Sequence, residues 1–272
     1  MSDKLGISGN VAVITGGGGA IGGEIARTLA RRNVSVAIWD IDQRAAERKA
    51  ADINAGGGIA VGLHCDITRK SAIAAALDET LKRFPTVHYL VNSAGGSNKA
   101  TTTSPDLPFE DIDVDAMVQV FSQNYLGTVA VSQLVAREFI RNNAGSIVNI
   151  SSIAGILPLT RAVSYSDAKA AVNSFTKWLA VHMAQHYSTR IRINAVAPGF
   201  ILTRQNRFLL VDEKTGELTE RGQQIFHSVP MGRFGTLQEI ADAVQWLLSD
   251  KASFITGAVI PVDGGYTAFS GV

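Results

Sequence analysis

Short apolar runs alternate along the chain with longer segments of helical period. The runs are rich in valine, isoleucine and alanine, and they predict strands over residues 11–14, 34–39, 59–64, 88–92, 146–150, 190–196 and 258–262. Between them, apolar residues recur three or four positions apart, which predicts helices near residues 22–32, 43–54, 70–83, 114–141, 163–187 and 237–249. The pattern therefore predicts strands and helices in regular alternation.

Strands that are apolar along their whole length are typical of a parallel sheet covered on both faces. We therefore expect an α/β fold with a single doubly wound, Rossmann-type parallel sheet of about seven strands and helices on both faces. No repeat or Pro/Ser-rich linker divides the chain, so residues 1–272 are expected to form one domain. Ligands of such sheets bind beyond the carboxyl ends of the strands, so the long irregular stretches 95–115 and 198–222 are expected to be substrate loops.

Composition narrows the classes of partner. With 25 basic and 24 acidic residues, the chain has no electrostatic signature for nucleic acid or an anionic membrane, which leaves small molecules and other protein chains. Residues 1–10 lack the apolar core of a signal peptide, and no apolar run approaches the roughly 18 residues that span a bilayer. We therefore expect a cytoplasmic protein. The single cysteine, Cys65, lies in an apolar stretch and is expected to be structural.

A glycine-rich turn follows the first predicted strand and precedes the first helix. Residues 15–22 read TGGGGAIG, and Gly17, Gly19 and Gly22 satisfy the spacing G-x-G-x-x-G. Glycines there let backbone N–H groups and the helix N-terminus approach a pyrophosphate without a Cβ in the way. This context predicts a dinucleotide site.

Asp40 ends the second predicted strand, eighteen residues beyond Gly22. A carboxylate at that place accepts hydrogen bonds from the adenosine ribose and repels a 2′-phosphate, which predicts NAD(H) in preference to NADP(H). Asp40 could instead cap the helix that follows, although Asp42 is better placed for that role.

Tyr165 and Lys169 lie four residues apart, so on a helix both side chains project from one face. A phenol is a poor base at neutral pH, but a neighbouring ammonium stabilises the phenolate and lowers the phenol pKa. The pair therefore suits proton exchange with an alcohol or a ketone.

In this context the sequence resembles the short-chain dehydrogenase/reductase family over nearly its whole length, from Gly9 to about Tyr266. The family's motifs occur in order: TGGGGAIG at 15–22, CDIT at 65–68, NSAG at 92–95, NYLG at 124–127, ISS at 150–152, YSDAK at 165–169, PG at 198–199 and DGG at 263–265. Two positions depart from the family pattern, Ala20 in the glycine loop and Ser93 where a second asparagine is usual.

The resemblance implies a catalytic set of Asn124, Ser152, Tyr165 and Lys169. It implies that Ser152 and Tyr165 hold the substrate oxygen and that Tyr165 is the general acid in reduction and the base in oxidation. Lys169 would lower the phenol pKa and bind the nicotinamide ribose, and Asn124 would hold a relay water. Ser151 is an alternative to Ser152, but the family's spacing to the tyrosine selects Ser152.

The resemblance and the glycine loop together imply NAD as cofactor. The residues expected to bind it are Gly16, Gly18, Gly19, Ala20, Ile21, Gly22, Asp40, Asp66, Ile67, Asn92, Ala94, Gly95, Tyr165, Lys169, Pro198, Gly199 and Thr203.

The substrate is less defined than the reaction. An arginine can hold a carboxylate by two parallel hydrogen bonds, and the loops carry Arg161, Arg204 and Arg207. Polar residues accompany them, namely Asn206 in the second loop and Ser97, Asn98 and Lys99 in the first. We expect Asn98, Arg161, Arg204, Asn206 and Arg207 to contact a sugar acid or polyol. Residues 205–210 and 266–272 and the four-glycine loop also resemble a subgroup of the family named D-mannonate oxidoreductases, or fructuronate reductases.

Two alternatives to this function remain open. The same catalytic residues would reduce a 3-oxoacyl thioester or another ketone, and a catalytically idle dinucleotide sensor is a further reading that the intact catalytic set argues against.

His182 and His186 are four residues apart but lack a third metal ligand, so no metal site is expected. The family commonly assembles through the two long helices and the C-terminal strand, which implies a homotetramer.

Overall fold

Seven parallel strands form one sheet in the computed structural model, which describes residues 5–203, 207–212 and 215–271. The strands are β1 (Val11–Thr15), β2 (Ser35–Asp40), β3 (Ala60–His64), β4 (Tyr89–Asn92), β5 (Gly145–Ile150), β6 (Ile191–Pro198) and β7 (Val259–Val262). Their order across the sheet is β3-β2-β1-β4-β5-β6-β7, and every pairing is parallel. Each predicted strand is found within two residues of its expected bounds.

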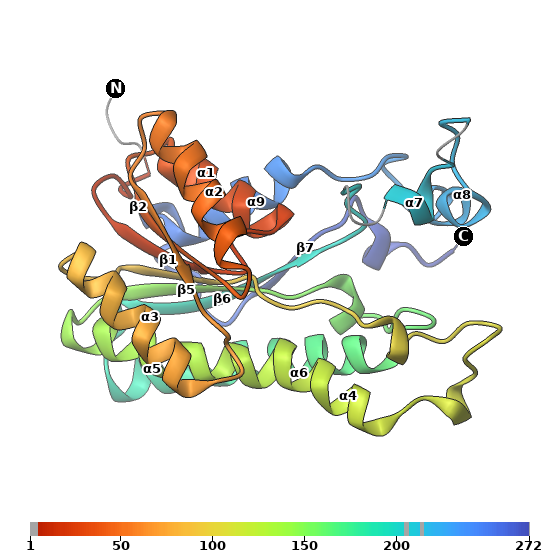
Figure 1. Cartoon of the computed structure of the whole chain (residues 1–272), viewed down its shortest axis with the longest axis horizontal. Coiled ribbons are helices and arrows are strands. Elements are labelled where there is room, and N and C mark those ends of the chain that lie inside the picture. Colours follow the sequence, from red (N-terminus) through yellow and green to blue (C-terminus); the bar gives the residue numbers. More distant parts are fainter. Residues whose placement is uncertain (1–4, 204–206, 213–214, 272) are drawn as a thin grey trace.

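Helices cover both faces of this sheet (Figure 1). One face carries α1 (Ala20–Ala30), α2 (Gln43–Ala55) and α9 (Leu237–Leu248), and the other carries α3 (Lys70–Arg83), α4 (Val114–Phe121), α5 (Gly127–Arg141) and α6 (Val163–His186). Alternate side chains of β1 enter the two cores: Ala12 and Ile14 pack with α1 and α9, whereas Val11 and Val13 pack on the opposite face. The expected doubly wound α/β fold is therefore confirmed.

The helix expected over residues 114–141 is interrupted by a π-turn. Between α4 and α5, residues Ser122–Leu126 form i→i+5 hydrogen bonds, so one extra residue is accommodated without ending the helix. Such turns rotate the side chains on either side relative to a regular helix. Asn124 lies inside the turn, and its amide donates to the Val120 carbonyl at 2.8 Å.

The stretch 198–222, expected to be irregular, carries helical segments. Helix α7 spans Arg207–Leu210, and α8 begins at Glu220 and ends at His227. Thr219 caps α8 by accepting a hydrogen bond from the Gly222 N–H at 3.0 Å. A capping threonine followed by an acidic first turn is a recognisable helix start, so this part of the prediction was incomplete.

The strand order reverses beside β1, where β2 lies on one side and β4 on the other. The connections from β1 and β4 therefore leave the sheet in opposite directions and open a crevice at their carboxyl ends, where this fold binds ligands. Thr15 joins the two ends, because its hydroxyl accepts hydrogen bonds from the Ser93 and Ala94 N–H groups at 3.1 and 3.2 Å. Across the described residues, no helix has the length and hydropathy needed to cross a bilayer.

Candidate active site

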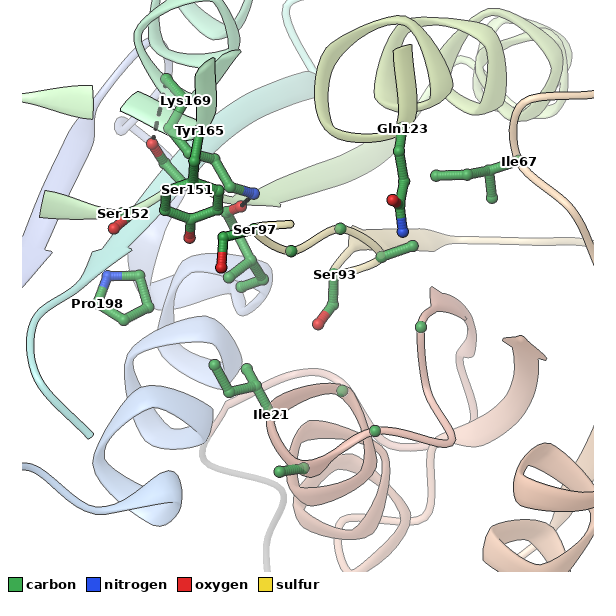
Figure 2. A pocket seen from close by; sticks show the side chains of 18 of the residues that line it. Ile21, Ile67, Ser93, Ser97, Gln123, Ser151, Ser152, Tyr165, Lys169 and Pro198 are labelled. Atoms are coloured by element: carbon green, nitrogen blue, oxygen red, sulfur yellow. Dashed lines mark hydrogen bonds between the residues drawn. The ribbon is translucent and has the colours of Figure 1, made fainter. Parts of the chain in front are cut away.

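A cavity of about 1320 Å³ opens at this carboxyl edge. The glycine turn after β1, the loops after β4, β5 and β6, the α4–π-turn region and the start of α6 all contribute to its walls. Figure 2 shows the Ser97, Ser152 and Tyr165 hydroxyls extending into it. One continuous space thus joins the predicted dinucleotide loop to the predicted catalytic residues.

The glycine turn presents bare backbone to this cavity. Gly16 has a φ of +62°, and a Cβ there would lie 2.7 Å from the Ala94 Cα. A Cβ on Gly22 would lie 2.9 Å from the Gly17 Cα, so glycine lets α1 pack directly on the turn. The N-cap of α1 is Gly19, no side chain caps this end, and its first turn has no acidic residue. Its free N–H groups suit an anion such as a pyrophosphate, so the residues present fit a dinucleotide.

Two acidic side chains lie at the same end of the cavity, because Asp40 is the last residue of β2 and Asp66 follows β3. The Asp40 carboxylate accepts hydrogen bonds from the Gly18 N–H at 3.0 Å and the Asp42 N–H at 2.9 Å. Each carboxylate oxygen has a second lone pair, so Asp40 can still accept from a ribose hydroxyl. Asp42 caps α2 through the Ala45 N–H at 3.1 Å, as expected. A hydrogen bond from the Thr68 hydroxyl is the main cause that lowers the pKa of Asp66.

The predicted catalytic residues meet at the other end of the cavity. Ser152 lies two residues after the end of β5, and Tyr165 and Lys169 lie on the first two turns of α6. Ser152 hydrogen-bonds the Tyr165 hydroxyl. The Lys169 ammonium donates to the Ile150 carbonyl at 2.9 Å and lies 5.6 Å from the centre of the Tyr165 ring. Ser151 instead donates to Asn173 at 2.6 Å, which leaves Ser152 as the available hydroxyl.

Burial has the largest effect on the pKa values of Lys169 and Tyr165. It lowers the pKa of Lys169 from 10.5 to about 8, because a desolvated ammonium loses its hydration. It raises the pKa of Tyr165, while the Ser152 hydrogen bond acts in the opposite direction. The pKa of Tyr165 is therefore raised, not lowered as expected, and Lys169 is not among the groups that change it. Burial also raises the pKa of Cys65 to about 12, which agrees with a structural role for that thiol.

Asn124, the fourth predicted catalytic residue, is fully buried beside the cavity and does not line it. Its side chain exchanges two hydrogen bonds with the Gly96 backbone, accepting at 3.0 Å and donating at 2.8 Å. Gly95 has a φ of +147°, and a Cβ there would collide with the Asn124 amide oxygen and lie 3.5 Å from the Lys169 ammonium. Asn124 and Lys169 are thus neighbours across a glycine.

Comparisons with known proteins agree with this geometry. A family model described as enoyl-(acyl carrier protein) reductase matches residues 18–267. An uncharacterised oxidoreductase of Bacillus subtilis, UxuB, is 36% identical over 98% of both chains. The chain belongs to the short-chain dehydrogenase/reductase family.

Solved structures of this family superpose closely on the chain. A protein of Haemophilus influenzae, assigned provisionally as a D-mannonate oxidoreductase and containing NAD, gives a TM-score of 0.93 at 34% identity over 99% of both chains. A 7α-hydroxysteroid dehydrogenase with NADH and 7-oxo glycochenodeoxycholic acid gives 0.85 at 32% identity over 97% of both chains. The predictions of the family and of an NAD-dependent dehydrogenase acting on a CH–OH group are confirmed.

Most residues that the family resemblance assigns to the cofactor line the cavity. Gly18 and Asn92 do not. The Gly18 N–H is bonded to Asp40, and Asn92 lies behind the surface, where its amide donates to Ser132 at 3.0 Å and to Asn149 at 2.8 Å. Residues of the predicted set that do line it are Gly16, Gly19, Ala20, Ile21, Gly22, Asp40, Asp66, Ile67, Ala94, Gly95, Tyr165, Lys169, Pro198, Gly199 and Thr203.

The predicted substrate residues that the structure describes do not line the cavity. Arg161 and Arg207 are exposed and do not line the cavity, and Arg204 and Asn206 lie outside the described residues. The Asn98 side chain also lies off the cavity, because it accepts from the Ala100 N–H at 3.0 Å and caps a short turn. Within the described part of the chain, no group of three or more potential ligands could hold a metal ion.

Sequence reasoning missed one wall of the cavity. Val118, Gln119, Ser122 and Gln123 line it from α4 and the π-turn, and Figure 2 shows the Gln123 amide directed into the space. Positions 118 and 122, like 119 and 123, are four apart and so share a helix face. That spacing, combined with the family position of Asn124, was the signal available in the sequence.

Proposed function

We propose that this short-chain dehydrogenase transfers a hydride between NAD(H) and a secondary alcohol or ketone of a sugar acid, with D-mannonate and D-fructuronate as the preferred pair. The observation that carries the proposal is a hydroxyl-rich cavity wall beside Ser152 and Tyr165, in a chain so similar to the Haemophilus influenzae protein. Ser97, Thr102 and Ser122 add hydroxyls, and Gln119 adds an amide. Such groups suit a substrate with several hydroxyls of its own.

The cofactor would lie along the cavity from the α1 N-terminus to Lys169. Backbone N–H groups around Gly19–Gly22 would bind the pyrophosphate, and Asp40 would bind the adenosine ribose. Asp66 and Ile67 would flank the adenine, and Thr203 would contact the nicotinamide end. When bound, NAD supplies the hydride acceptor or donor of the reaction.

The chain's own residues then handle the substrate oxygen and its proton. Ser152 donates a hydrogen bond to that oxygen and orients it toward Tyr165. In reduction the Tyr165 hydroxyl gives its proton to the developing alkoxide, and in oxidation the phenolate removes the proton from the alcohol. Because burial raises the pKa of Tyr165, the hydroxyl is protonated at neutral pH and is ready to act as the acid.

Lys169 and Asn124 complete the proton path in this proposal. The ammonium of Lys169 stabilises the phenolate once Tyr165 has lost its proton. Asn124 shares the neighbourhood of Gly95 with Lys169. Its amide oxygen accepts one hydrogen bond from the Gly96 N–H and can accept a second from a water beside the ammonium. That water would pass the proton between Lys169 and solvent.

A 3-oxoacyl thioester is the second candidate substrate. It is favoured by apolar residues that line the same cavity, namely Ile153, Leu159, Phe200 and Ile201. The description of the matching family model also names an acyl thioester, although one reduced at its C=C bond. Both substrates would use the same catalytic residues, so the cavity lining decides between them.

Reduction assays separate the two candidates. Purified protein is given NADH with D-fructuronate in one series and with acetoacetyl-CoA in another, and kcat/KM is compared. We expect the sugar acid to be preferred by at least about tenfold, which corresponds to roughly 1.4 kcal/mol of transition-state discrimination. A preference for the thioester would replace the proposed function with the second candidate.

We also expect the chain to act in the cytoplasm as a homotetramer. Exposed apolar side chains lie on the outer helices, with Leu126 52%, Trp178 60% and Val181 55% exposed. Contact between copies would remove them from water. Light scattering coupled to size-exclusion chromatography measures the mass, and a monomer would contradict this assembly.

A further inference from the structure

The charged side chains that line the cavity fall into two groups. Among the described residues they are Asp40, Asp66, Lys99 and Lys169. Asp40 ends β2 and Asp66 follows β3 at the end assigned to adenosine, and the Lys169 ammonium is buried against the Ile150 carbonyl. Lys99 is different, because it is exposed and belongs to the loop that follows β4.

The loop that carries Lys99 is tied at one end to Asn124 and at the other to the segment that precedes α6. Before Lys99, the Gly96 backbone is bound by two hydrogen bonds to Asn124. After it, the Thr103 N–H donates to the Arg161 carbonyl at 2.9 Å, four residues before Tyr165 in the chain. The loop therefore spans from the π-turn to the start of α6, across the substrate end of the cavity.

Local hydrogen bonds also fix the turn in which Lys99 lies. The Asn98 side chain accepts from the Ala100 N–H at 3.0 Å. The Asn98 carbonyl accepts from the hydroxyls of Thr101 and Thr102 at 3.1 and 2.8 Å. A loop ordered in this way loses little backbone entropy when a ligand binds to it. Asn98 thus positions the turn, and its neighbour Lys99 faces the cavity.

From these contacts we infer that Lys99 binds the carboxylate of the substrate and selects acids over uncharged polyols. The inference rests on the proposed function and names the cation that it requires. Arg161 and Arg207, which the sequence had suggested, do not line the cavity, whereas Lys99 does. An ammonium on a flexible stem forms a charge-assisted hydrogen bond with a carboxylate, stronger than one between neutral groups.

Ser97 extends the same subsite. It precedes Lys99 by two residues, lines the cavity and points its hydroxyl into it (Figure 2). A substrate whose carboxylate contacts Lys99 would pass Ser97 on the way to Ser152 and Tyr165. The hydroxyl of Ser97 would donate a hydrogen bond to one of the substrate's own hydroxyls or accept one from it.

Steady-state kinetics with four proteins test the assignment. Wild type, Lys99→Met, Lys99→Arg and Lys251→Met are each given saturating NAD+ with varied D-mannonate, and KM for NAD+ is measured separately. Methionine preserves the length of the stem and removes the charge. Lys251 is an exposed lysine of the 3₁₀ turn Asp250–Ala252 that does not line the cavity, so its variant controls for the loss of one positive charge.

We expect Lys99→Met to raise KM for D-mannonate by about tenfold or more, the loss of one charge-assisted hydrogen bond, with KM for NAD+ unchanged. Lys99→Arg should recover most of the affinity, and Lys251→Met should match wild type. If wild type oxidises D-mannonate and Lys99→Met has an unchanged KM, the role assigned to Lys99 is overturned and the proposed function stands. Failure of wild type to oxidise D-mannonate, with D-mannitol turned over instead, would overturn the proposed function and the Lys99 assignment with it.

Discussion

The Lys169 ammonium lies 5.6 Å from the centre of the Tyr165 ring, and burial acts on the two groups in opposite directions. It lowers the pKa of Lys169 to about 8 and raises the pKa of Tyr165. Both changes favour the neutral forms, because the charged forms lose hydration inside the protein. The pair therefore holds the phenol in its neutral form, which is the form that donates a proton in reduction.

Removal of the phenol hydroxyl should abolish proton transfer and spare cofactor binding. We expect Tyr165→Phe to lower kcat by about 10²–10⁴, the usual contribution of general acid–base catalysis. Titration of the variant with NADH, followed by the change in protein fluorescence, should give a Kd close to that of wild type. Substantial turnover by Tyr165→Phe would exclude Tyr165 as the residue that transfers the proton.

The lowered pKa of Lys169 predicts a dependence of stability on pH. Between pH 8 and 10.5 the unfolded chain holds a proton on this lysine that the folded chain has lost, so the free energy of unfolding rises with pH. By pH 9.5 the rise from this group should reach about 2 kcal/mol. Below pH 8 both states are protonated, and Lys169 adds no slope.

Urea denaturation of wild type and Lys169→Met at pH 7.5, 8.5 and 9.5 isolates this effect, with the three values of pH chosen to lie below and within the window. The difference between the two proteins should grow in favour of wild type as pH rises. Tyr165, whose pKa is raised, acts in the opposite direction only near and above pH 10 and is common to both proteins. A difference that is constant across the three pH values would mean that Lys169 is charged in the folded protein throughout.

Asp40 is predicted to set the preference for NADH. Replacement by alanine removes the negative charge that would repel a 2′-phosphate, so the ratio of kcat/KM for NADPH to that for NADH should rise roughly tenfold, about 1.4 kcal/mol. Asp42→Ala is the matched control, because Asp42 caps α2. It should cost about 1 kcal/mol of stability and leave the cofactor ratio unchanged. Equal ratios in wild type and Asp40→Ala would exclude Asp40 as the selector.

Gly95 and Gly96 provide an adjacent pair of test positions. A Cβ on Gly95 would collide with the Asn124 amide oxygen, and its φ of +147° disfavours any other residue. Gly95→Ala should therefore displace Asn124 and lower stability by about 1–3 kcal/mol. A Cβ on Gly96 would meet no atom within 4 Å, so the melting temperature of Gly96→Ala should stay close to that of wild type. Similar melting temperatures for the two variants would show that Asn124 can move without cost.

The regular part of the fold could be predicted because its physical signals are local. Strands such as β1 and β6 are apolar throughout since both faces of the sheet are buried, and the glycine turn and the Tyr165–Lys169 spacing are readable from a few residues. The π-turn at Ser122–Leu126 leaves no such signal. It is stabilised by contacts of Asn124 with Gly96, twenty-eight residues away, which only the folded chain creates.

The charged residue that lines the substrate end of the cavity could not be identified from the sequence. An arginine is the stronger carboxylate ligand in general, so Arg161 and Arg207 were the natural candidates. Their direction depends on the path of two loops, and the backbone of Arg161 has a φ of +77° that no sequence rule anticipates. Lys99 lines the cavity because the Gly96 and Thr103 contacts determine the course of its loop.

Oxidation of D-mannonate by wild type, with Tyr165→Phe as the blank, is the decisive measurement for the proposed sugar-acid dehydrogenase. Purified protein is mixed with NAD+ and either D-mannonate or D-mannitol, and the appearance of NADH is followed by absorbance. We expect turnover of D-mannonate that exceeds turnover of D-mannitol and is lost in Tyr165→Phe. Turnover of D-mannitol without turnover of D-mannonate would contradict this expectation, and would make the chain a dehydrogenase of uncharged alcohols.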